Sequence, residues 1–158
     1  MNRANAFLDR KQYERARDDF SRAIAFAPRS AAAYAGRARA NQEAGSLDPA
    51  IADYRKLLEL EPRNVGALYG MGLAYKSKRQ DEKAIEVFNE LLRIEPRYAA
   101  ASYQNAGMFS RAGKIDSACV WLGEAVANGY RDWDALKNDA DFDAIRKVDC
   151  YQKIMSGK

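Results

Sequence analysis

Residues 65–98, VGALYGMGLAYKSKRQDEKAIEVFNELLRIEPRY, contain the pattern that decides the fold. In the first half of this stretch, Leu68, Met71, Gly72 and Tyr75 follow at i, i+3, i+4 and i+7. Apolar and small residues at this spacing lie on one face of a helix. The second half carries its own apolar stripe, formed by Ala84, Phe88, Leu91 and Leu92. The two stripes predict two amphipathic helices with a break at KSKRQ.

The same unit recurs along the chain at a constant interval, with a period of about 34 residues. Prolines recur at one position of the unit, small residues at two others, and a large apolar residue at a fourth. A fixed period of this length is the signature of a helical-repeat protein, in which each unit is one supersecondary element. The four rows are Pro28, Pro62 and Pro96; Ala4, Ala38, Gly72 and Ala106; Ala16, Ala50, Ala84 and Ala118; and Phe20, Tyr54, Phe88 and Leu122.

Residues that start and stop helices follow the period as well. Each periodic proline is expected to close a second helix, and Ser30 and Asn64, two residues further on, are expected to cap the next helix. Between the two helices of the second unit, Gly45 suits a helix C terminus. Asp48 followed by Pro49 predicts an N-cap with proline at the first helical position.

The period, the recurring spacing of small, aromatic and proline positions within the chain, and the helix–turn–helix unit resemble the tetratricopeptide repeat. The resemblance covers residues 1–132, with an incomplete copy at 1–30 and full copies at 31–64, 65–98 and 99–132. It implies an all-α fold, a right-handed α-solenoid of antiparallel helix pairs. In such a fold each pair buries its apolar stripe against its neighbours.

The chain departs from the family pattern at four positions. Asn41 stands where an aromatic residue is usual, and Tyr130 replaces the last proline. Lys11 and Arg79 take the place of the turn glycine. Met1 falls inside the first helix of the incomplete copy, and two explanations stay open: the chain is a piece of a longer array, or the terminal repeat is naturally shortened.

Residues 133–158, WDALKNDADFDAIRKVDCYQKIMSGK, leave the period. Their apolar residues keep roughly helical spacing, and Asp141 is expected to cap a short helix that begins near Phe142. The segment also resembles the D-x-D-F-x-x-[LI]-R stretch that ends many bacterial tetratricopeptide arrays. We expect capping helices that cover the last repeat and turn their charged residues to water. A tethered ligand that folds into the groove of the array is the alternative.

The composition removes much of enzyme chemistry. The 158 residues include no His, so imidazole-dependent nucleophiles, proton shuttles and metal sites are excluded. Cys119 and Cys150 lack the CxxC spacing of a thiolate metal site. We expect two reduced, half-buried thiols, and a disulfide between the two residues is the alternative. Asp139, Asp141 and Asp143 alternate along a stretch expected to be exposed and suggest no pocket. We predict that the protein is not an enzyme and needs no cofactor or metal.

Charge and hydropathy limit the remaining classes. The net charge of +4, from 26 basic and 22 acidic residues, is spread over the helices and interleaved in sign. This pattern mildly favours an acidic partner and falls short of a nucleic-acid footprint. No window approaches the roughly 18 apolar residues of a membrane span, and the charged N-terminal sequence is not expected to act as a signal peptide. A soluble protein is expected, with the cytoplasm favoured.

The resemblance implies that the first helices of the repeats line a concave groove. Tyr69 and Tyr103 hold the same position in consecutive repeats, and a tyrosine ring combines apolar contact with a polar tip. Small residues such as Gly36 and Gly70 are expected to leave room in the groove. The alternative is that both tyrosines only pack between helices. The candidate groove residues are Asn5, Arg39, Tyr69, Leu73, Lys76, Tyr103, Gln104 and Arg111.

We therefore expect a protein-interaction scaffold whose groove binds an extended or helical segment of a partner protein. Some family members bind chaperone tails through a carboxylate clamp of Lys, Asn, Asn, Lys and Arg; here only Asn5 fits the clamp positions, so this activity is disfavoured. RNA-reading repeats need regular polar pairs, which the row of Gly36 and Gly70 lacks. Self-association through exposed ends of the solenoid is the alternative function, and it would give a homo-oligomer.

Overall fold

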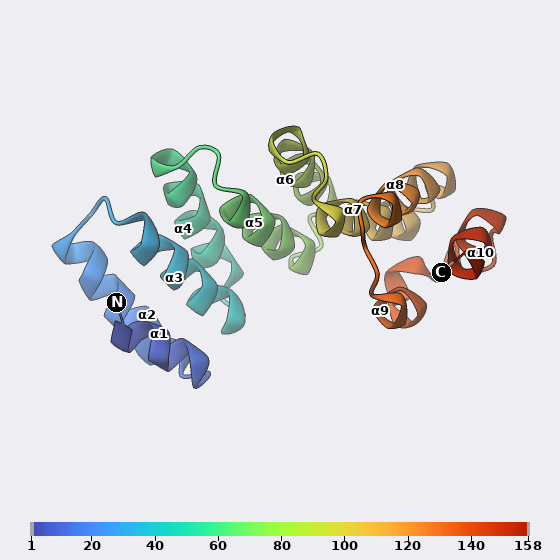
Figure 1. The fold of residues 1–158 in the computed structure, drawn as a ribbon. Coiled ribbons are helices and arrows are strands. Elements are labelled where there is room, and N and C mark those ends of the chain that lie inside the picture. The colour runs from blue at the N-terminus through green and yellow to red at the C-terminus, as the bar shows by residue number, and fades with distance from the viewer. Residues whose placement is uncertain (1, 158) are drawn as a thin grey trace. The chain divides into compact units, whose positions relative to one another are not determined.

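The computed structural model describes residues 2–157, which contain helices and no strand. Figure 1 shows these helices in consecutive pairs, and the predicted all-α solenoid class is confirmed. Met1, expected in the first helix, and Lys158, at the end of the expected cap, lie outside the described residues. The helices are α1 (Asn2–Asp9), α2 (Tyr13–Phe26), α3 (Ala31–Glu43), α4 (Leu47–Leu60), α5 (Val65–Ser77), α6 (Asp81–Ile94), α7 (Ala99–Arg111), α8 (Ile115–Ala127), α9 (Trp133–Asn138), the 3₁₀ helix η1 (Ala140–Phe142) and α10 (Asp149–Ser156).

The chain forms two compact units, residues 1–87 and 88–158, and the boundary between them falls within α6. In the first unit, α1 pairs with α2 and α3 pairs with α4, while α2 and α4 also pack on the helix that follows each pair. In addition, α3 contacts both α1 and α5, so these three helices lie side by side. In the second unit, α7 pairs with α8, η1 packs on α7, and α10 packs on α8.

The periodic small residues are buried where helices meet. Ala16, Ala50, Ala84 and Ala118 all have an exposed fraction of 0%. Helices approach closely only where the contact residues lack bulk, so these alanines leave the neighbouring space to the large apolar row. That row is buried too, with Phe20, Phe88 and Leu122 at 0% and Tyr54 at 7%.

The turn between the two helices of each repeat needs a left-handed residue. Gly45 and Gly113 have φ values of +77° and +68°, and Lys11 and Arg79, at the equivalent positions, have +56° and +60°. Glycine adopts this conformation without the steric penalty that a Cβ brings. The two non-glycine turns therefore keep the conformation of the glycine turns but carry local strain.

The predicted helix starts are partly right. The side chains of Ser30 and Asn64 accept hydrogen bonds from the backbone N–H three residues on, at 3.3 and 2.8 Å, as expected. The expectation that Asp48 is an N-cap is wrong, because α4 begins at Leu47. Asp48 and Pro49 instead lie in the first turn, where a missing proline N–H breaks no helical hydrogen bond.

Asn41, at the position where an aromatic residue is usual, belongs to a buried polar cluster. Arg37 donates from Nε and Nη2 to the two carboxylate oxygens of Asp53 at 2.9 and 2.7 Å, and Asn41 Nδ2 donates to the same carboxylate at 3.2 Å. Arg3 and Asp19, at the equivalent positions of the preceding repeat, form the same two-bond pair at 2.6 and 2.7 Å. A carboxylate on the facing helix thus accepts the Asn41 amide N–H, while Asn41 Oδ1 is buried with no hydrogen-bond partner among the described residues.

The C-terminal segment shares one hydrophobic core with α7 and α8. Leu136, Phe142 and Ile145 are completely buried in it, and Tyr151 is 3% exposed. Asp139, rather than the expected Asp141, caps η1, because its side chain accepts the backbone N–H two residues on at 2.9 Å.

Cys119 of α8 and Cys150 of α10 form a disulfide, with their Cα atoms 5.9 Å apart. The expectation of two reduced thiols is wrong here, because α10 packs on α8 and brings together residues that are 31 positions apart.

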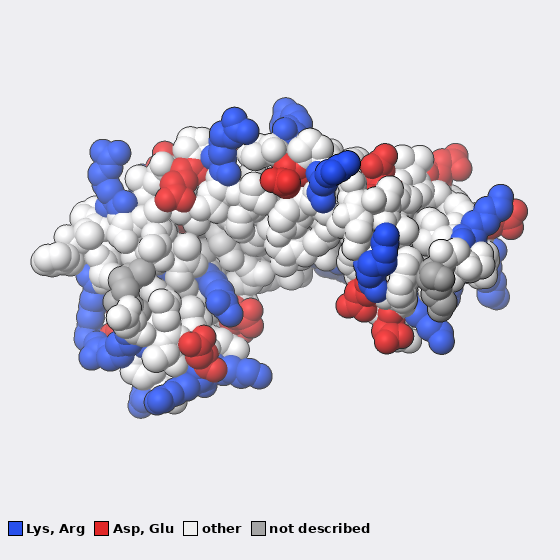
Figure 2. Space-filling view, in the orientation of Figure 1, with Lys and Arg blue, Asp and Glu red and all other residues white. Residues whose placement is uncertain are grey.

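Charged residues occur on the surface of both units. On the face shown in Figure 2, Lys and Arg side chains are interleaved with Asp and Glu, as the sequence predicted. Every helix between residues 2 and 157 falls short of the length and apolarity that crossing a bilayer requires.

Candidate binding site

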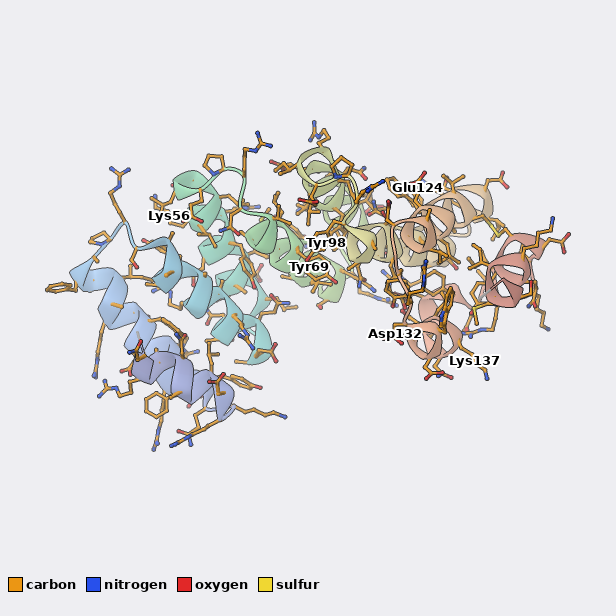
Figure 3. The ribbon with its side chains drawn as sticks, in the orientation of Figure 1. Lys56, Tyr69, Tyr98, Glu124, Asp132 and Lys137 are labelled. Atoms are coloured by element: carbon orange, nitrogen blue, oxygen red, sulfur yellow. A yellow bond between two sulfur atoms is a disulfide. The ribbon has the colours of Figure 1, made fainter. Side chains whose placement is uncertain are left out.

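The first unit places five candidate residues on three adjacent helices. Asn5 on α1 and Arg39 on α3 are exposed, and Tyr69, Leu73 and Lys76 on α5 are half-buried. Tyr69 can be followed on α5 in Figure 3. Asn5, Arg39 and Leu73 are separated by one full period each, so they hold one repeat position on helices that lie side by side.

Arg39 lines a cavity of about 280 Å³ between the α1–α2 turn and α3. Two bases and two acids meet at this cavity, so its charge is balanced, whereas the sequence hypothesis placed only positive charge along the groove. The two acids were missed although they hold equivalent positions in consecutive repeats, which is the signal that could have found them. The lining residues are Leu8, Asp9, Lys11, Tyr13, Arg39 and Glu43.

The glycines of the groove-facing positions do not leave open room. A Cβ at Gly36 would overlap the ring of Phe20, and one at Gly70 would overlap the ring of Tyr54. In both cases the aromatic residue precedes the glycine by 16 positions, so the sequence carried a signal for this packing. The Tyr54 hydroxyl donates to Gln42 Oε1 at 2.8 Å, and burial raises the pKa of Tyr54 to about 12.

Tyr103 on α7 is covered by other parts of the second unit. Its ring stacks on Tyr130 with the centroids 4.2 Å apart, and the Phe142 centroid lies 5.1 Å away. Its hydroxyl donates to Asp139 Oδ2 at 2.7 Å. Burial, together with this hydrogen bond to a carboxylate, raises the pKa of Tyr103 far above its usual value. With 6% of its surface exposed, Tyr103 packs between elements of the second unit.

Arg111 and Gln104, the other candidates on α7, are half-buried. Arg111 Nη1 donates to Asp141 Oδ1 at 2.6 Å, and the two side chains are 18% and 13% exposed. Beside this pair, a Cβ added at Gly107 would lie 3.1 Å from the Asp141 Cβ. Asp139 and Asp141 were expected to face water, and the structure shows both bound to α7 instead.

Antiparallel helix pairs that recur at one constant interval define a helical-repeat protein of the α-solenoid class. Three family models match the chain: two described as "Tetratricopeptide repeat", over residues 1–59 and 65–98, and one described as "TPR repeat", over residues 43–78. The chain therefore contains a tetratricopeptide-repeat segment, within residues 1–98.

Solved tetratricopeptide-repeat structures have the same fold. The crystal structure of MamA is 22% identical, with 79% of this chain and 73% of that chain aligned at a TM-score of 0.77. YrrB, described as a TPR protein with an unusual peptide-binding site, is 17% identical over 99% of this chain and 81% of its own, with a TM-score of 0.75. TTC0263, a thermophilic TPR protein in Thermus thermophilus, is 24% identical over 82% and 72%, with a TM-score of 0.65. No curated protein sequence matches the chain.

Proposed function

We propose that this protein-interaction scaffold binds an extended or helical segment of a partner protein on the face formed by α1, α3 and α5, without a carboxylate clamp. The tetratricopeptide-repeat segment supports the general role, because repeats of this family serve as interaction scaffolds rather than as enzymes. The observation that carries the specific proposal is the side-by-side placement of the three first helices, with Arg39 on one and Tyr69, Leu73 and Lys76 on the next.

The chemistry of this face suits a peptide. Tyr69 and Leu73 offer partly exposed apolar surface, and a tyrosine contributes contact area with little loss of conformational entropy. The cavity beside Arg39 has room for a partner side chain, and its two bases and two acids suit a polar one. The peptide-binding site named for YrrB supports a peptide as the ligand class.

The division of the chain is part of this proposal. The repeat array spans 1–132 and presents the binding face, and capping helices in 133–158 close its second unit. The buried core that α9, η1 and α10 share with α7 and α8 supports the capping role.

A peptide array followed by affinity measurements tests the proposal. Peptides selected with the full chain are titrated against the chain and against Tyr69→Ala/Lys76→Ala by fluorescence anisotropy. Truncating two central contacts commonly costs about 1–2 kcal/mol each, so we expect Kd to rise at least about tenfold.

The matched control is Tyr98→Ala, which removes another half-buried tyrosine at the start of α7, outside the groove-facing positions. Its Kd should stay within about twofold of the unmodified chain. Selected peptides that bind the double variant and the unmodified chain equally well would remove the α5 face from the proposal.

Self-association remains the second candidate function, and one observation favours it. Phe26, at the end of α2, is 93% exposed and borders a shallow surface pocket with Arg3, Asp19, Arg22 and Ala23. An exposed aromatic ring next to charged groups is suited to contact with another protein surface. Light scattering over a range of concentrations tests this candidate: a mass that rises with concentration and falls back in Phe26→Ser supports it, and a constant monomer mass rejects it.

A further inference from the structure

The turn that follows α9 is held on α7 in the manner of a bound peptide. Two carboxylates two residues apart make separate polar contacts: Asp139 accepts from the Tyr103 hydroxyl at 2.7 Å, and Asp141 accepts from Arg111 at 2.6 Å. The next residue, Phe142, is completely buried against the Tyr103 ring. The α7 surface thus contacts an acidic residue, a second acidic residue two positions later, and an aromatic residue directly after it.

The α7 surface is shaped for this sequence. Gly107 occupies the repeat position at which the preceding copies carry Asn5, Arg39 and Leu73. Asp141 lies directly over this glycine, where a side chain would crowd its Cβ. The absence of a side chain at Gly107 therefore makes room for an acidic residue that Arg111 can reach.

Net stability is a weak reason for the ion pair between Arg111 and Asp141. A partly buried ion pair adds little net stability, because desolvation of the two charges offsets their attraction, and an apolar cover would serve as well. These contacts contribute selectivity for an acidic segment. A segment without the two carboxylates would remove water from Arg111 and from the Tyr103 hydroxyl and would not supply the acceptors that Asp139 and Asp141 provide.

We propose that Tyr103, Gly107 and Arg111 form a subsite for a partner segment that carries two acidic residues two positions apart followed by an aromatic residue. Residues 139–142 occupy this subsite until such a partner displaces them. The proposal rests on the proposed function, in which first-helix faces bind peptides. A tethered segment competes at an effective concentration on the order of millimolar, so the partner binds tightly only when the tethered copy is weakened.

The test uses the full chain and a fluorescent peptide of sequence KNDADFDAIR, which copies residues 137–146. Its Kd is measured by anisotropy for the unmodified chain and for Asp139→Asn/Asp141→Asn. The amides keep the shape of the segment but remove both charges, so the peptide should bind the variant at least about tenfold more tightly. Asp143→Asn is the matched control, because that carboxylate is 69% exposed and pairs with Arg146 instead of α7; its Kd should not change.

Two additional variants locate the peptide. Arg111→Gln in the Asp139→Asn/Asp141→Asn background should abolish the gain, because it removes the cation that pairs with Asp141. Tyr69→Ala/Lys76→Ala in the same background should preserve the gain. Loss of binding in that last variant assigns the peptide to α5 and overturns this proposal. The proposed function is tested separately, by the binding of the array-selected peptides, so the two proposals can fail independently.

The proposal is also overturned if the folded Asp139→Asn/Asp141→Asn variant binds no more tightly than the unmodified chain. Circular dichroism is recorded for each variant. If neutralising the two acids unfolds the second unit, the segment is a structural cover and not a displaceable ligand, and that result equally rejects the proposal.

Discussion

The helices α5 and α7 begin consecutive repeats and carry a tyrosine at the same position, but the two residues have different surroundings. Tyr69 on α5 is half-buried, whereas Tyr103 on α7 lies under Tyr130 and Phe142 and donates to Asp139. The repeat determines the position on the helix from which a side chain projects. A segment outside the repeat determines whether that side chain is covered.

The neighbouring positions show the same contrast. On α3, Arg39 remains exposed beside a cavity, and on α7, Arg111 is paired with Asp141. The sequence hypothesis placed both arginines along one groove. In the structure, the α3 and α5 positions are candidates for a partner, and the α7 positions hold the C-terminal segment.

Phe142→Ala should have the largest effect on the contrast between the covered α7 positions and the uncovered α3 and α5 positions, because it weakens the cover. The ring is completely buried against Tyr103 and Tyr151, and emptying such a site costs about 3–5 kcal/mol of unfolding free energy. Urea unfolding measures the loss. Phe26→Ala removes the same ring where it is 93% exposed and should change stability by less than about 0.5 kcal/mol. If both variants lose the same unfolding free energy, the C-terminal segment that contains Phe142 is not packed on α7 as described.

Removing the disulfide should have the next largest effect. Cys119 and Cys150 close a loop across 31 positions, and the loss of this constraint on the unfolded chain corresponds to about 3.7 kcal/mol. Cys119→Ser/Cys150→Ser is compared with the unmodified chain by urea unfolding without reductant. With excess dithiol reductant the two proteins should unfold at the same urea concentration; a difference that persists there would assign the effect to packing instead.

The hydrogen bond between Tyr103 and Asp139 sharpens the comparison between the tyrosines. Tyr103→Phe should cost about 1–2 kcal/mol of unfolding free energy, because the carboxylate loses a partly buried donor. A double-mutant cycle with Asp139→Ala isolates the pair, and its coupling energy should exceed about 0.5 kcal/mol. A coupling near zero would show that the two side chains do not interact in solution.

Alkaline pH tests the burial of Tyr54, whose ring lies against Gly70 in the first unit. Burial raises the pKa of Tyr54 from 10 to about 12, so between these values the unfolded chain loses the phenol proton and the folded chain keeps it. Stability should therefore fall as pH rises from 10 towards 12, by at most about 1 kcal/mol per pH unit from this group. Unfolding free energies at pH 9, 10 and 11 measure the slope. Tyr54→Phe should have the shallower slope, and an unchanged slope would exclude Tyr54 as its source.

The smallest effect is expected at the turns, where the repeats are most alike. Lys11→Gly and Arg79→Gly should each stabilise the chain by about 0.5–1 kcal/mol, because glycine adopts the observed positive φ without strain. Thermal or urea unfolding measures the change. Lys11→Ala and Arg79→Ala, which lose the charge but keep the Cβ, should not stabilise; a gain in these controls would point to charge instead of backbone conformation.

Much of the fold could be predicted because it is local and periodic. The rows of alanine and aromatic residues predicted which faces are buried, and Ser30 and Asn64 predicted two helix starts. The pair of half-buried Arg37 and buried Asp53 was not predicted, although Arg3 and Asp19 form the same pair one repeat earlier. Charged residues of globular proteins are usually exposed, so composition alone gave no reason to bury Asp53.

By itself, the sequence determined the helical-repeat class and the positions of the first helices, because periodicity specifies which residues face a neighbouring helix. The tertiary structure decided that Cys119 meets Cys150 and that Asp139 and Asp141 turn towards α7. Those contacts join residues from 30 to 36 positions apart, across a segment with no period, so no local pattern encodes them. They form because packing Leu136, Phe142 and Ile145 against α7 and α8 buries apolar surface, and that burial brings the acidic residues with it.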